Sequence, residues 1–313
     1  MTSAMGGGTA SDIGTCGACI PAATSGIWHG MNGTDPARRS LVRVHQGWLG
    51  ISLMCGCWLL NWTLPGTRTA YLFFPLWLGF ILTVDTLVLC RAGTSLWTRS
   101  HRDFALLFVA SAPGWWLFEA LNQRTGNWQY LGTECFSDLE YFILCTVSFS
   151  TVMPAVFETA ELVRTFHWVD RFAKGPRVPR TPGLRVKLLM AGVLMLGLLL
   201  AWPRFFYPFL WLSLVLILEP VNGWLGRRQL LDDLQQGNWR PAIALSTGAL
   251  ICGCFWEMWN YYSFPKWIYH TPGVEFLHVF EMPLLGYGGY IPFALELFAL
   301  RSLLFAKAPP LRL

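Results

Sequence analysis

"KLLMAGVLMLGLLLAW", from Lys187 to Trp202, is an apolar run whose only charged residue is the first. Runs of about 18 to 20 apolar residues cross a bilayer as helices, and several comparable runs lie elsewhere in the chain. The 313 residues are 54% hydrophobic and 13% charged, whereas soluble domains carry about 25% charged residues. The sequence therefore predicts an all-α polytopic membrane protein.

The apolar runs predict about eight transmembrane spans. They cover residues 46–64, 70–90, 103–121, 136–162, 186–202, 205–222, 241–260 and 274–302. The fourth and eighth contain Pro154 and Pro292, which predict a kink or a tilt there. Residues 1–40 are rich in Gly, Ala and Thr, and we expect them to be disordered. Their Cys16 and Cys19 form a lone Cys-x-x-Cys pair, without a second pair to complete a zinc site.

The basic residues fall on one side of this predicted topology. Of the 23 Lys and Arg residues, 19 lie in the terminal segments and in the second, fourth and sixth connections, and 4 lie on the other side. The positive-inside rule then places both termini in the cytoplasm, and we expect a cytoplasmic membrane of bacterial type. The net charge of +5 indicates membrane topology and contact with anionic lipid, not nucleic-acid binding.

An internal repeat is visible in the polar residues. "WWLFEALNQRTGNWQY" (Trp115–Tyr130) and "FWEMWNYYSFPKWIY" (Phe255–Tyr269) both read Glu-x-x-Asn and then Trp-x-Tyr. Rare polar residues in one order and at nearly equal spacing indicate a duplication, since apolar segments alone resemble one another by chance. The matched pairs are Asp85 with Glu219, Glu119 with Glu257, Asn122 with Asn260, Trp128 with Trp267, Tyr130 with Tyr269, Pro154 with Pro292 and Glu158 with Glu296.

Two four-helix repeats follow from this alignment, residues 41–163 and residues 186–304, joined by a basic cytoplasmic linker at residues 164–185. Because each repeat has an even number of spans, the second copy enters the membrane in the same orientation as the first. The predicted relation is a pseudo-twofold axis along the membrane normal, the parallel type of repeat. Equivalent residues then face one another across a central seam.

Acidic residues inside apolar spans are costly unless they are protonated, paired or facing a cavity. Glu119 and Asn122 are three residues apart and share one helix face, as do Glu257 and Asn260. A buried, neutral carboxylic acid can give a proton to a substrate, so both acid–amide pairs are catalytic candidates. Stapling of helices by the same groups is the structural alternative. A second polar layer, toward the opposite ends of the spans, is predicted from Asp85, Glu219, Glu158 and Glu296.

Tryptophan is frequent, with 17 residues, and several lie beside the candidate acids. Aromatic faces stabilise cations, and a closed apolar site excludes water. A buried acid beside aromatic walls is what proton-initiated cyclisation of an isoprenoid needs. The alternative role is an aromatic belt at the membrane interface. The aromatic residues that we predict to contact substrate are Trp116, Trp128, Tyr130, Trp256, Trp267 and Tyr269.

His278 and Glu281 are further candidates for acid–base work or for substrate contact, three residues apart at the start of the eighth predicted span. The first repeat has Glu140 and Ile143 at the equivalent positions, which argues against a symmetric metal site. No zinc-protease, phosphate-loop or dinucleotide motif is present in the sequence. We therefore predict no metal, and the need for another cofactor stays open.

The acid–Asn pair and the Trp-x-Tyr segment resemble those of the small membrane lycopene cyclases, the heterodimeric or fused type of carotenoid biosynthesis. Glu119, Asn122, Trp128 and Tyr130 match these two elements, and the second repeat supplies the equivalents. The resemblance implies two similar helical units and an isomerase that acts on a carotenoid or a related isoprenoid.

A third element of that family, a helix start reading Pro-x-Glu-Glu-Tyr/Phe, is only partly matched. "SDLEYFIL", with Asp138, Glu140 and Tyr141, is similar to it and makes Glu140 a third catalytic candidate. The Pro-x-Glu-Glu itself is missing, and the second repeat has "FLHVFEMP" in its place. Each repeat also has more predicted spans than a unit of that family.

Three function classes stay open. The first is an enzyme that acts on an isoprenoid or carotenoid lipid. The second is a non-enzymatic scaffold or a lipid- or pigment-binding subunit, present as a homo-oligomer or within a membrane complex. The third is a transporter that uses its acids as proton relays.

Overall fold

The computed structural model describes residues 36–64 and 66–313, with the side chains of residues 36–44 and 68 left out. Contacts between residues divide the chain into two units, Met1–Arg39 and Ser40–Leu313. The helices and strands described here belong to the second unit, except for the first residues of α1. Cys16, Cys19 and most of the segment predicted to be disordered lie outside the described residues. Helix α1 (Pro36–Thr63) begins at Pro36, so it includes the last residues of that segment.

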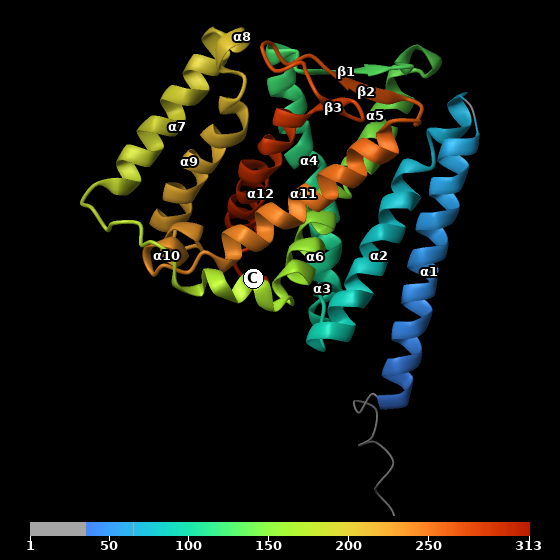
Figure 1. The fold of residues 1–313 in the computed structure, drawn as a ribbon, viewed down its shortest axis with the longest axis horizontal. Helices are drawn as coiled ribbons and strands as arrows, with labels where there is room; N and C mark the ends of the chain where they lie inside the picture. The colour runs from blue at the N-terminus through green and yellow to red at the C-terminus, as the bar shows by residue number, and fades with distance from the viewer. Residues whose placement is uncertain (1–35, 65) are drawn as a thin grey trace, which may run out of the picture. The chain divides into compact units, whose positions relative to one another are not determined.

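Within the described residues, five helical segments are long and apolar enough to cross a membrane. Figure 1 shows them as the long rods of a helical bundle, together with α1. Their lengths fit an integral membrane protein. Helix α9 (Phe209–Trp224) is equally apolar but shorter. The five segments are α2 (Phe73–Ala92), α4 (His101–Thr125), the α5–α6 pair (Asp138–Arg164), α7 (Leu184–Ala201) and α11 (Arg240–Asn260).

The eighth predicted span, residues 274–302, is wrong in its first half. Only α12 (Tyr290–Leu304) is an α-helix there. The preceding residues form two short paired strands, β3 (His278–Val279) and β4 (Met282–Pro283), and the 3₁₀ helix η4 (Leu284–Gly289). Proline and glycine explain the difference, because "MPLLGYGG" concentrates the residues that are least favourable inside a helix.

The fourth predicted span is divided into α5 (Asp138–Phe149) and α6 (Val152–Arg164). The division falls just before Pro154, which lies in the first turn of α6, as Pro292 lies in the first turn of α12. Proline is tolerated in a first turn, where its missing N–H has no helical partner to lose. The kink that Pro154 predicts is therefore present as a helix break.

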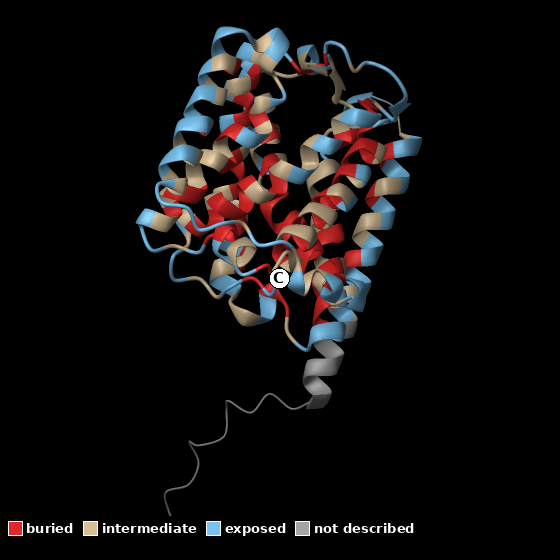
Figure 2. Cartoon of the chain, turned by 60° about the vertical axis from the view of Figure 1, so that its left-hand side comes forward, coloured by how far each residue is buried: buried red, intermediate tan, exposed pale blue. Residues whose placement is uncertain are grey.

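The core lies where α11 packs against α6 and against α12. Figure 2 shows buried residues along these central helices and exposed residues on the outer ones. Close contact is made by small residues, since a Cβ added at Gly248 of α11 would lie 2.7 Å from the backbone nitrogen of Ala160 on α6. The outer face of α7 presents exposed Met190 and Leu194. Such a face suits lipid rather than water.

A two-stranded ribbon joins the ends of α4 and α11. Strands β1 (Trp128–Leu131) and β2 (Lys266–Tyr269) pair antiparallel, with Trp128 opposite Tyr269 and Tyr130 opposite Trp267. Figure 1 shows the ribbon lying across one end of the bundle. It thereby brings the two Trp-x-Tyr motifs together.

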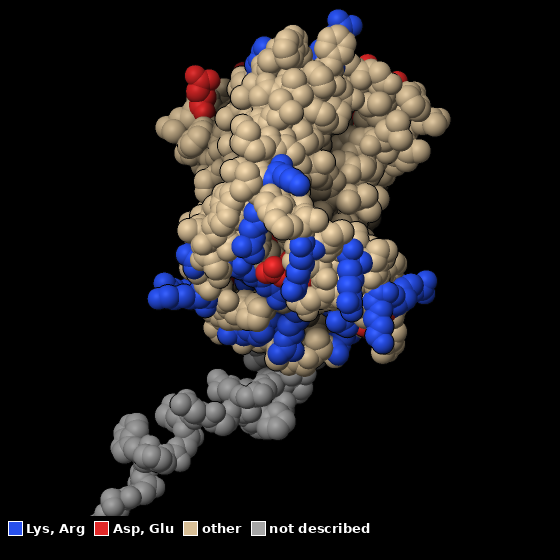
Figure 3. All heavy atoms as spheres, turned by 90° about the vertical axis from the view of Figure 1, so that its left-hand side faces the viewer, with Lys and Arg blue, Asp and Glu red and all other residues tan. Residues whose placement is uncertain are grey.

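The remaining short helices lie in the connections between the long ones. Figure 3 shows Lys and Arg side chains gathered at the end of the bundle away from the ribbon. This is the side on which the sequence predicts most of the basic residues. The short helices are η1 (Gly66–Thr69), α3 (Leu96–Arg99), η2 (Thr133–Cys135), η3 (His167–Lys174), α8 (Pro203–Phe206) and α10 (Leu230–Gln235).

Candidate functional site

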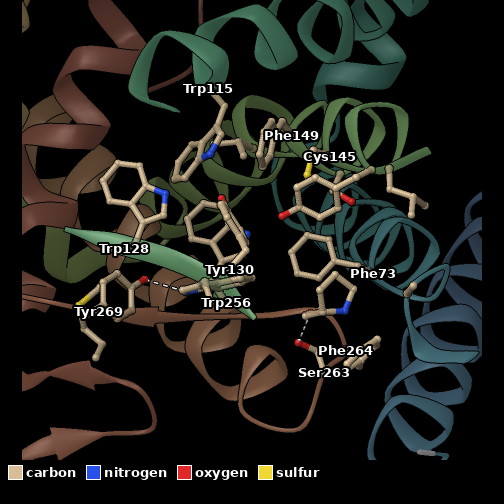
Figure 4. Close-up of a pocket in the computed structure, with 18 of the residues that line it drawn as sticks. Phe73, Trp115, Trp128, Tyr130, Cys145, Phe149, Trp256, Ser263, Phe264 and Tyr269 are labelled. Atoms are coloured by element: carbon tan, nitrogen blue, oxygen red, sulfur yellow. Dashed lines mark hydrogen bonds between the residues drawn. The ribbon is translucent and has the colours of Figure 1, made fainter. Parts of the chain in front are cut away.

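An aromatic cavity of about 140 Å³ lies beneath the β1–β2 ribbon. Thirteen of its 24 lining residues are aromatic, and none of the described residues that line it is Asp, Glu, Lys, Arg or His. Figure 4 shows Trp115, Trp128, Tyr130, Trp256 and Tyr269 around it. The other aromatic residues of the wall are Phe73, Tyr141, Phe149, Trp211, Phe264, Trp267, Tyr290 and Phe293.

The volume of the cavity limits what it can hold. An apolar cavity of about 150 Å³ in another protein binds benzene. The present cavity of about 140 Å³ therefore suits a group the size of one ring or a short branched hydrocarbon, not a whole lipid. Its aromatic and uncharged lining favours an apolar group.

Glu119 of α4 is held by three donors that converge on one carboxylate oxygen. Its Oε1 accepts from Trp115 Nε1 at 2.9 Å, from Trp128 Nε1 at 3.1 Å and from the Tyr130 hydroxyl at 2.6 Å. Trp115 precedes Glu119 by one helical turn, so both share a face of α4. Trp128 and Tyr130 alternate along β1 and lie on the same side of the strand.

Glu257 of α11 is held by hydroxyl groups. Its Oε1 accepts from the Tyr269 hydroxyl at 2.7 Å and from the Tyr290 hydroxyl at 2.8 Å. Trp267 Nε1 donates to the Tyr269 oxygen at 2.8 Å, one step removed from the carboxylate. The second oxygen, Glu257 Oε2, is buried and has no hydrogen-bond partner among the described residues.

The two asparagines hold the ribbon rather than the carboxylates. Asn122 Nδ2 donates to the carbonyl of Trp128 at 2.7 Å, and its Oδ1 accepts from the backbone of Asn127 at 2.9 Å. Asn260 Nδ2 likewise donates to the carbonyl of Trp267 at 2.7 Å, and its Oδ1 accepts from the same residue's N–H at 2.8 Å. Backbone groups that leave a helix end need such partners. In the described contacts neither asparagine donates to the glutamate that shares its helix face.

The two carboxyls lie behind the cavity wall. Neither Glu119 nor Glu257 is among the described residues that line the cavity, whereas all five side chains that donate to them are. Each glutamate is therefore connected to the cavity through the indole and phenol groups that donate to it.

The ribbon tyrosines keep their protons over a wide pH range. Burial, followed by the nearby charge of Glu119, raises the pKa of Tyr130 well above its usual range. Burial, followed by the nearby charge of Glu257, does the same to the pKa of Tyr269. Both hydroxyls are therefore available as donors at any ordinary working pH.

Besides the two glutamates and the two asparagines, four predicted site residues lie outside the cavity lining. Trp116 donates to Thr146 Oγ1 at 3.0 Å on α5. Glu140 caps α5, because it accepts from the backbone and the hydroxyl of Ser137 in a capping box. His278 is exposed on β3.

Glu281, the fourth of these residues, pairs with Lys266 of β2. The pair lies beside the ribbon, and neither residue contributes to the cavity wall. Trp128, Tyr130, Trp256, Trp267 and Tyr269 line the cavity, and their contact with a substrate stays a prediction.

Two of the five side chains that donate to the glutamates, Trp115 and Tyr290, escaped the sequence analysis as candidates. Trp115 could have been found, because its spacing of four residues from Glu119 places both on one helix face. Tyr290 carried no such signal, since it is 33 residues from Glu257 in the chain and lay inside a predicted continuous span.

Two acids of the second predicted polar layer, Asp85 and Glu219, cap short helices. Asp85 Oδ1 accepts from the backbone of Trp97 at 3.1 Å at the start of α3. Glu219 accepts from the backbones of Leu230 and Leu231 at 3.2 and 3.0 Å at the start of α10. A carboxylate at a helix N-terminus satisfies free N–H groups and complements the helix dipole.

Glu158 of α6 and Glu296 of α12 are the other members of that layer. Both are buried, and neither carboxyl has a hydrogen-bond partner among the described residues. Across the described part of the chain, no group of three or more His, Cys, Asp or Glu residues could hold a metal ion.

Comparison of the chain with protein-family models, with curated proteins and with solved structures gives no match. The resemblance to the membrane lycopene cyclases therefore stays a prediction from the residues that carry it.

Proposed function

We propose that this protein is an integral membrane isomerase that binds the end of an isoprenoid or carotenoid-type lipid in the aromatic cavity and cyclises it with acid. The observation that carries the proposal is the wall of the cavity. It is apolar, aromatic and uncharged, yet five of its side chains donate hydrogen bonds to two buried glutamates.

The chemistry of cyclisation suits such a wall. A proton adds to the terminal double bond, and the π electrons of a second double bond attack the resulting carbocation and close a carbon–carbon bond. Loss of a proton from the carbon beside the new cation restores a double bond. The product is an isomer, and the balance needs no oxidant or reductant. Aromatic faces stabilise the cations, and the absence of water in such a site prevents their hydration.

The size of the cavity supports binding of one end of the lipid. A volume of about 140 Å³ accommodates the ring that forms, and the rest of the chain remains among the helices in the bilayer. A terminal cyclisation needs only the last isoprene units at the site, so the volume and the reaction agree.

We further propose that the bundle is a duplicated four-helix unit with parallel repeats. Each half gives its glutamate a tyrosine hydroxyl, at 2.6 Å to Glu119 and 2.7 Å to Glu257. The ribbon register supports a twofold relation, because Trp128 with Tyr269 and Tyr130 with Trp267 are equivalent pairs. Asp85 and Glu219 also perform the same capping role in their own halves.

The proposed location is a bacterial-type cytoplasmic membrane, with both termini in the cytoplasm. The support is the distribution of charge, since Lys and Arg gather at the end away from the ribbon. The ribbon and the cavity then lie toward the external face. The basic end contacts anionic lipid headgroups.

A binding-only role is the second candidate, and one observation favours it. Because Glu119 and Glu257 lie behind the wall, their hydrogen bonds could serve only to orient a rigid aromatic pocket. The protein would then be a lipid- or pigment-binding subunit of a membrane complex or a homo-oligomer.

Incubation of the purified protein with lycopene and with shorter acyclic polyprenoids tests the proposal. We expect a product of unchanged mass with an altered absorption spectrum and retention time, and Glu119→Gln with Glu257→Gln in one chain abolishes it. A pigment that co-purifies and binds without product formation supports the binding role. Full activity of the double variant would remove both glutamates from the mechanism.

A further inference from the structure

The two carboxyls of the site differ in the kind of donor that holds them. Glu119 Oε1 accepts from two indole N–H groups, those of Trp115 and Trp128, besides the Tyr130 hydroxyl. An indole N–H is a donor only, so neither tryptophan can take up a proton or pass one on. With both indoles directed at it, this oxygen stays an acceptor.

Glu257 Oε1 contacts hydroxyls instead, and a hydroxyl can donate and accept at once. The Tyr269 oxygen accepts from Trp267 Nε1. The hydrogen of the Tyr269 hydroxyl is therefore directed to Glu257. No indole donates to the Tyr290 hydroxyl in the described contacts, so its hydrogen can point to Glu257 or into the cavity that Tyr290 lines. Glu257 Oε2 is buried without a partner among the described residues, and an unpartnered buried oxygen favours the neutral, protonated carboxyl.

The two halves differ at two matched positions, and this difference explains why Tyr290 contacts Glu257. The alignment that matches Glu119 with Glu257 also matches Trp115 with Gly253 and Val152 with Tyr290. A Cβ added at Gly253 would lie 2.5 Å from the ring of Tyr290, so the ring occupies the space that a side chain at position 253 would take. In the first half α4, which carries Glu119, also supplies the donor Trp115. In the second half the corresponding donor to Glu257 is Tyr290 of α12.

We propose that Tyr290 is the catalytic residue that gives the proton to the bound isoprenoid, with Glu257 as its proton store, and that Glu119 only orients the aromatic wall. This inference rests on the proposed cyclisation. In the reacting form the proton of Glu257 lies on Oε1 and is donated to the Tyr290 oxygen at 2.8 Å, while the Tyr290 hydrogen points into the cavity. As this hydrogen is transferred to the terminal double bond, the Tyr290 oxygen takes the proton of Glu257 Oε1. The cyclised cation later loses a proton to the same hydroxyl, which returns one to Glu257, so no proton is gained or lost overall.

Turnover of single variants tests the division of roles. General acid catalysis contributes about 100-fold or more, so we expect Tyr290→Phe and Glu257→Gln to lower kcat by about that factor. Glu119→Gln loosens the wall and acts mainly on KM. Tyr207→Phe is the control, because its hydroxyl bonds the carbonyl of Pro272 outside the cavity. A larger loss of kcat in Glu119→Gln than in Glu257→Gln would overturn the assignment.

A double variant tests whether the hydroxyl of Tyr290 matters or only the space that its ring fills. Gly253→Trp with Tyr290→Val gives the second half the residue pair of the first, with an indole donor for Glu257 and no hydroxyl. We expect it to fold and to lose kcat as Tyr290→Phe does. The reciprocal variant, Trp115→Gly with Val152→Tyr, keeps the relay and should have the higher kcat of the two. Equal kcat in both double variants contradicts the proposal.

Infrared spectroscopy decides the inference without a substrate. The carboxylic-acid carbonyl band of Glu257 is identified during acid titration as the band that Glu257→Gln removes. We expect Tyr290→Phe to shift the frequency of this band. A band that Tyr290→Phe leaves in place means that the two groups are not linked. If the unaltered protein yields no product but this shift is found, the cyclisation fails while the Tyr290–Glu257 link stands.

Discussion

Trp128 of the first half lies opposite Tyr269 of the second in the antiparallel ribbon, and the same register pairs Tyr130 with Trp267. Each cross-strand pair therefore combines one indole with one phenol. Each tyrosine nevertheless donates to the glutamate of its own half. Both halves thus contribute residues to the wall of the cavity, whereas each carboxyl is bonded by the ribbon tyrosine of its own half.

The amide of Asn260 should contribute strongly to stability. Asn260→Ala leaves the N–H and the carbonyl of Trp267 without their partners at 2.8 and 2.7 Å, and we expect a loss of about 2 kcal/mol. Thermal unfolding in detergent micelles measures it. Asn238→Ala, at a partly buried amide in the connection between α10 and α11, is the control and should change stability by less. A loss no larger than that of the control would contradict a special contribution of the Asn260 hydrogen bonds to the ribbon.

Gly248 should tolerate no side chain. Gly248→Ala places a Cβ 2.7 Å from the backbone of Ala160, and the forced separation of α6 and α11 should cost about 1–3 kcal/mol. Gly197→Ala on α7 is the matched control, since a Cβ there meets nothing within 4 Å. Because alanine has the higher helix propensity, that variant should be neutral or slightly stabilising. A stable Gly248→Ala protein would contradict the close crossing.

The raised pKa values of Tyr130 and Tyr269 predict a loss of stability in alkali. An unfolded tyrosine ionises near pH 10, while these buried hydroxyls keep their protons above that pH. Their contribution is therefore complete below about pH 10 and declines as the pH rises further. Melting temperatures between pH 8 and pH 11 should fall less steeply in Tyr130→Phe than in the unaltered protein. Tyr71→Phe, at an exposed hydroxyl, should keep the original slope.

Filling the cavity should prevent lipid binding without disturbing the fold. Cys145 of α5 lines the cavity, and Cys145→Phe places a ring in a space of about 140 Å³. Quenching of tryptophan fluorescence by an apolar polyene reports binding, and we expect it to be lost. Cys90→Phe, at an exposed cysteine of α2, should leave it unchanged. Retained quenching in Cys145→Phe would place the lipid elsewhere.

The sequence predicted the parts of the site that rest on local spacing. Glu119 with Asn122 and Trp128 with Tyr130 share faces because helical and strand periods impose it. Apolar length likewise identified most of the helices, since a spanning helix needs about 20 apolar residues. These features depend on residues that are close together in the chain.

Long-range relations were less accessible. Tyr290 reaches Glu257 across 33 residues, and its place depends on the missing side chain of Gly253. Hydropathy also failed at residues 278–289, because "MPLLGYGG" is apolar enough to belong to a span while its one proline and three glycines do not support a helix. Whether a carboxyl lies in a wall or behind it likewise depends on packing between elements.

The ribbon has a mechanical consequence. Backbone hydrogen bonds between β1 and β2 tie the end of α4 to the end of α11, and the two asparagines tie each strand to its own helix. A displacement of one helix end is therefore transmitted through stiff links to the other. The side chains that hold the two glutamates therefore belong to one connected frame, so a displacement on one side of the cavity should also move the other side.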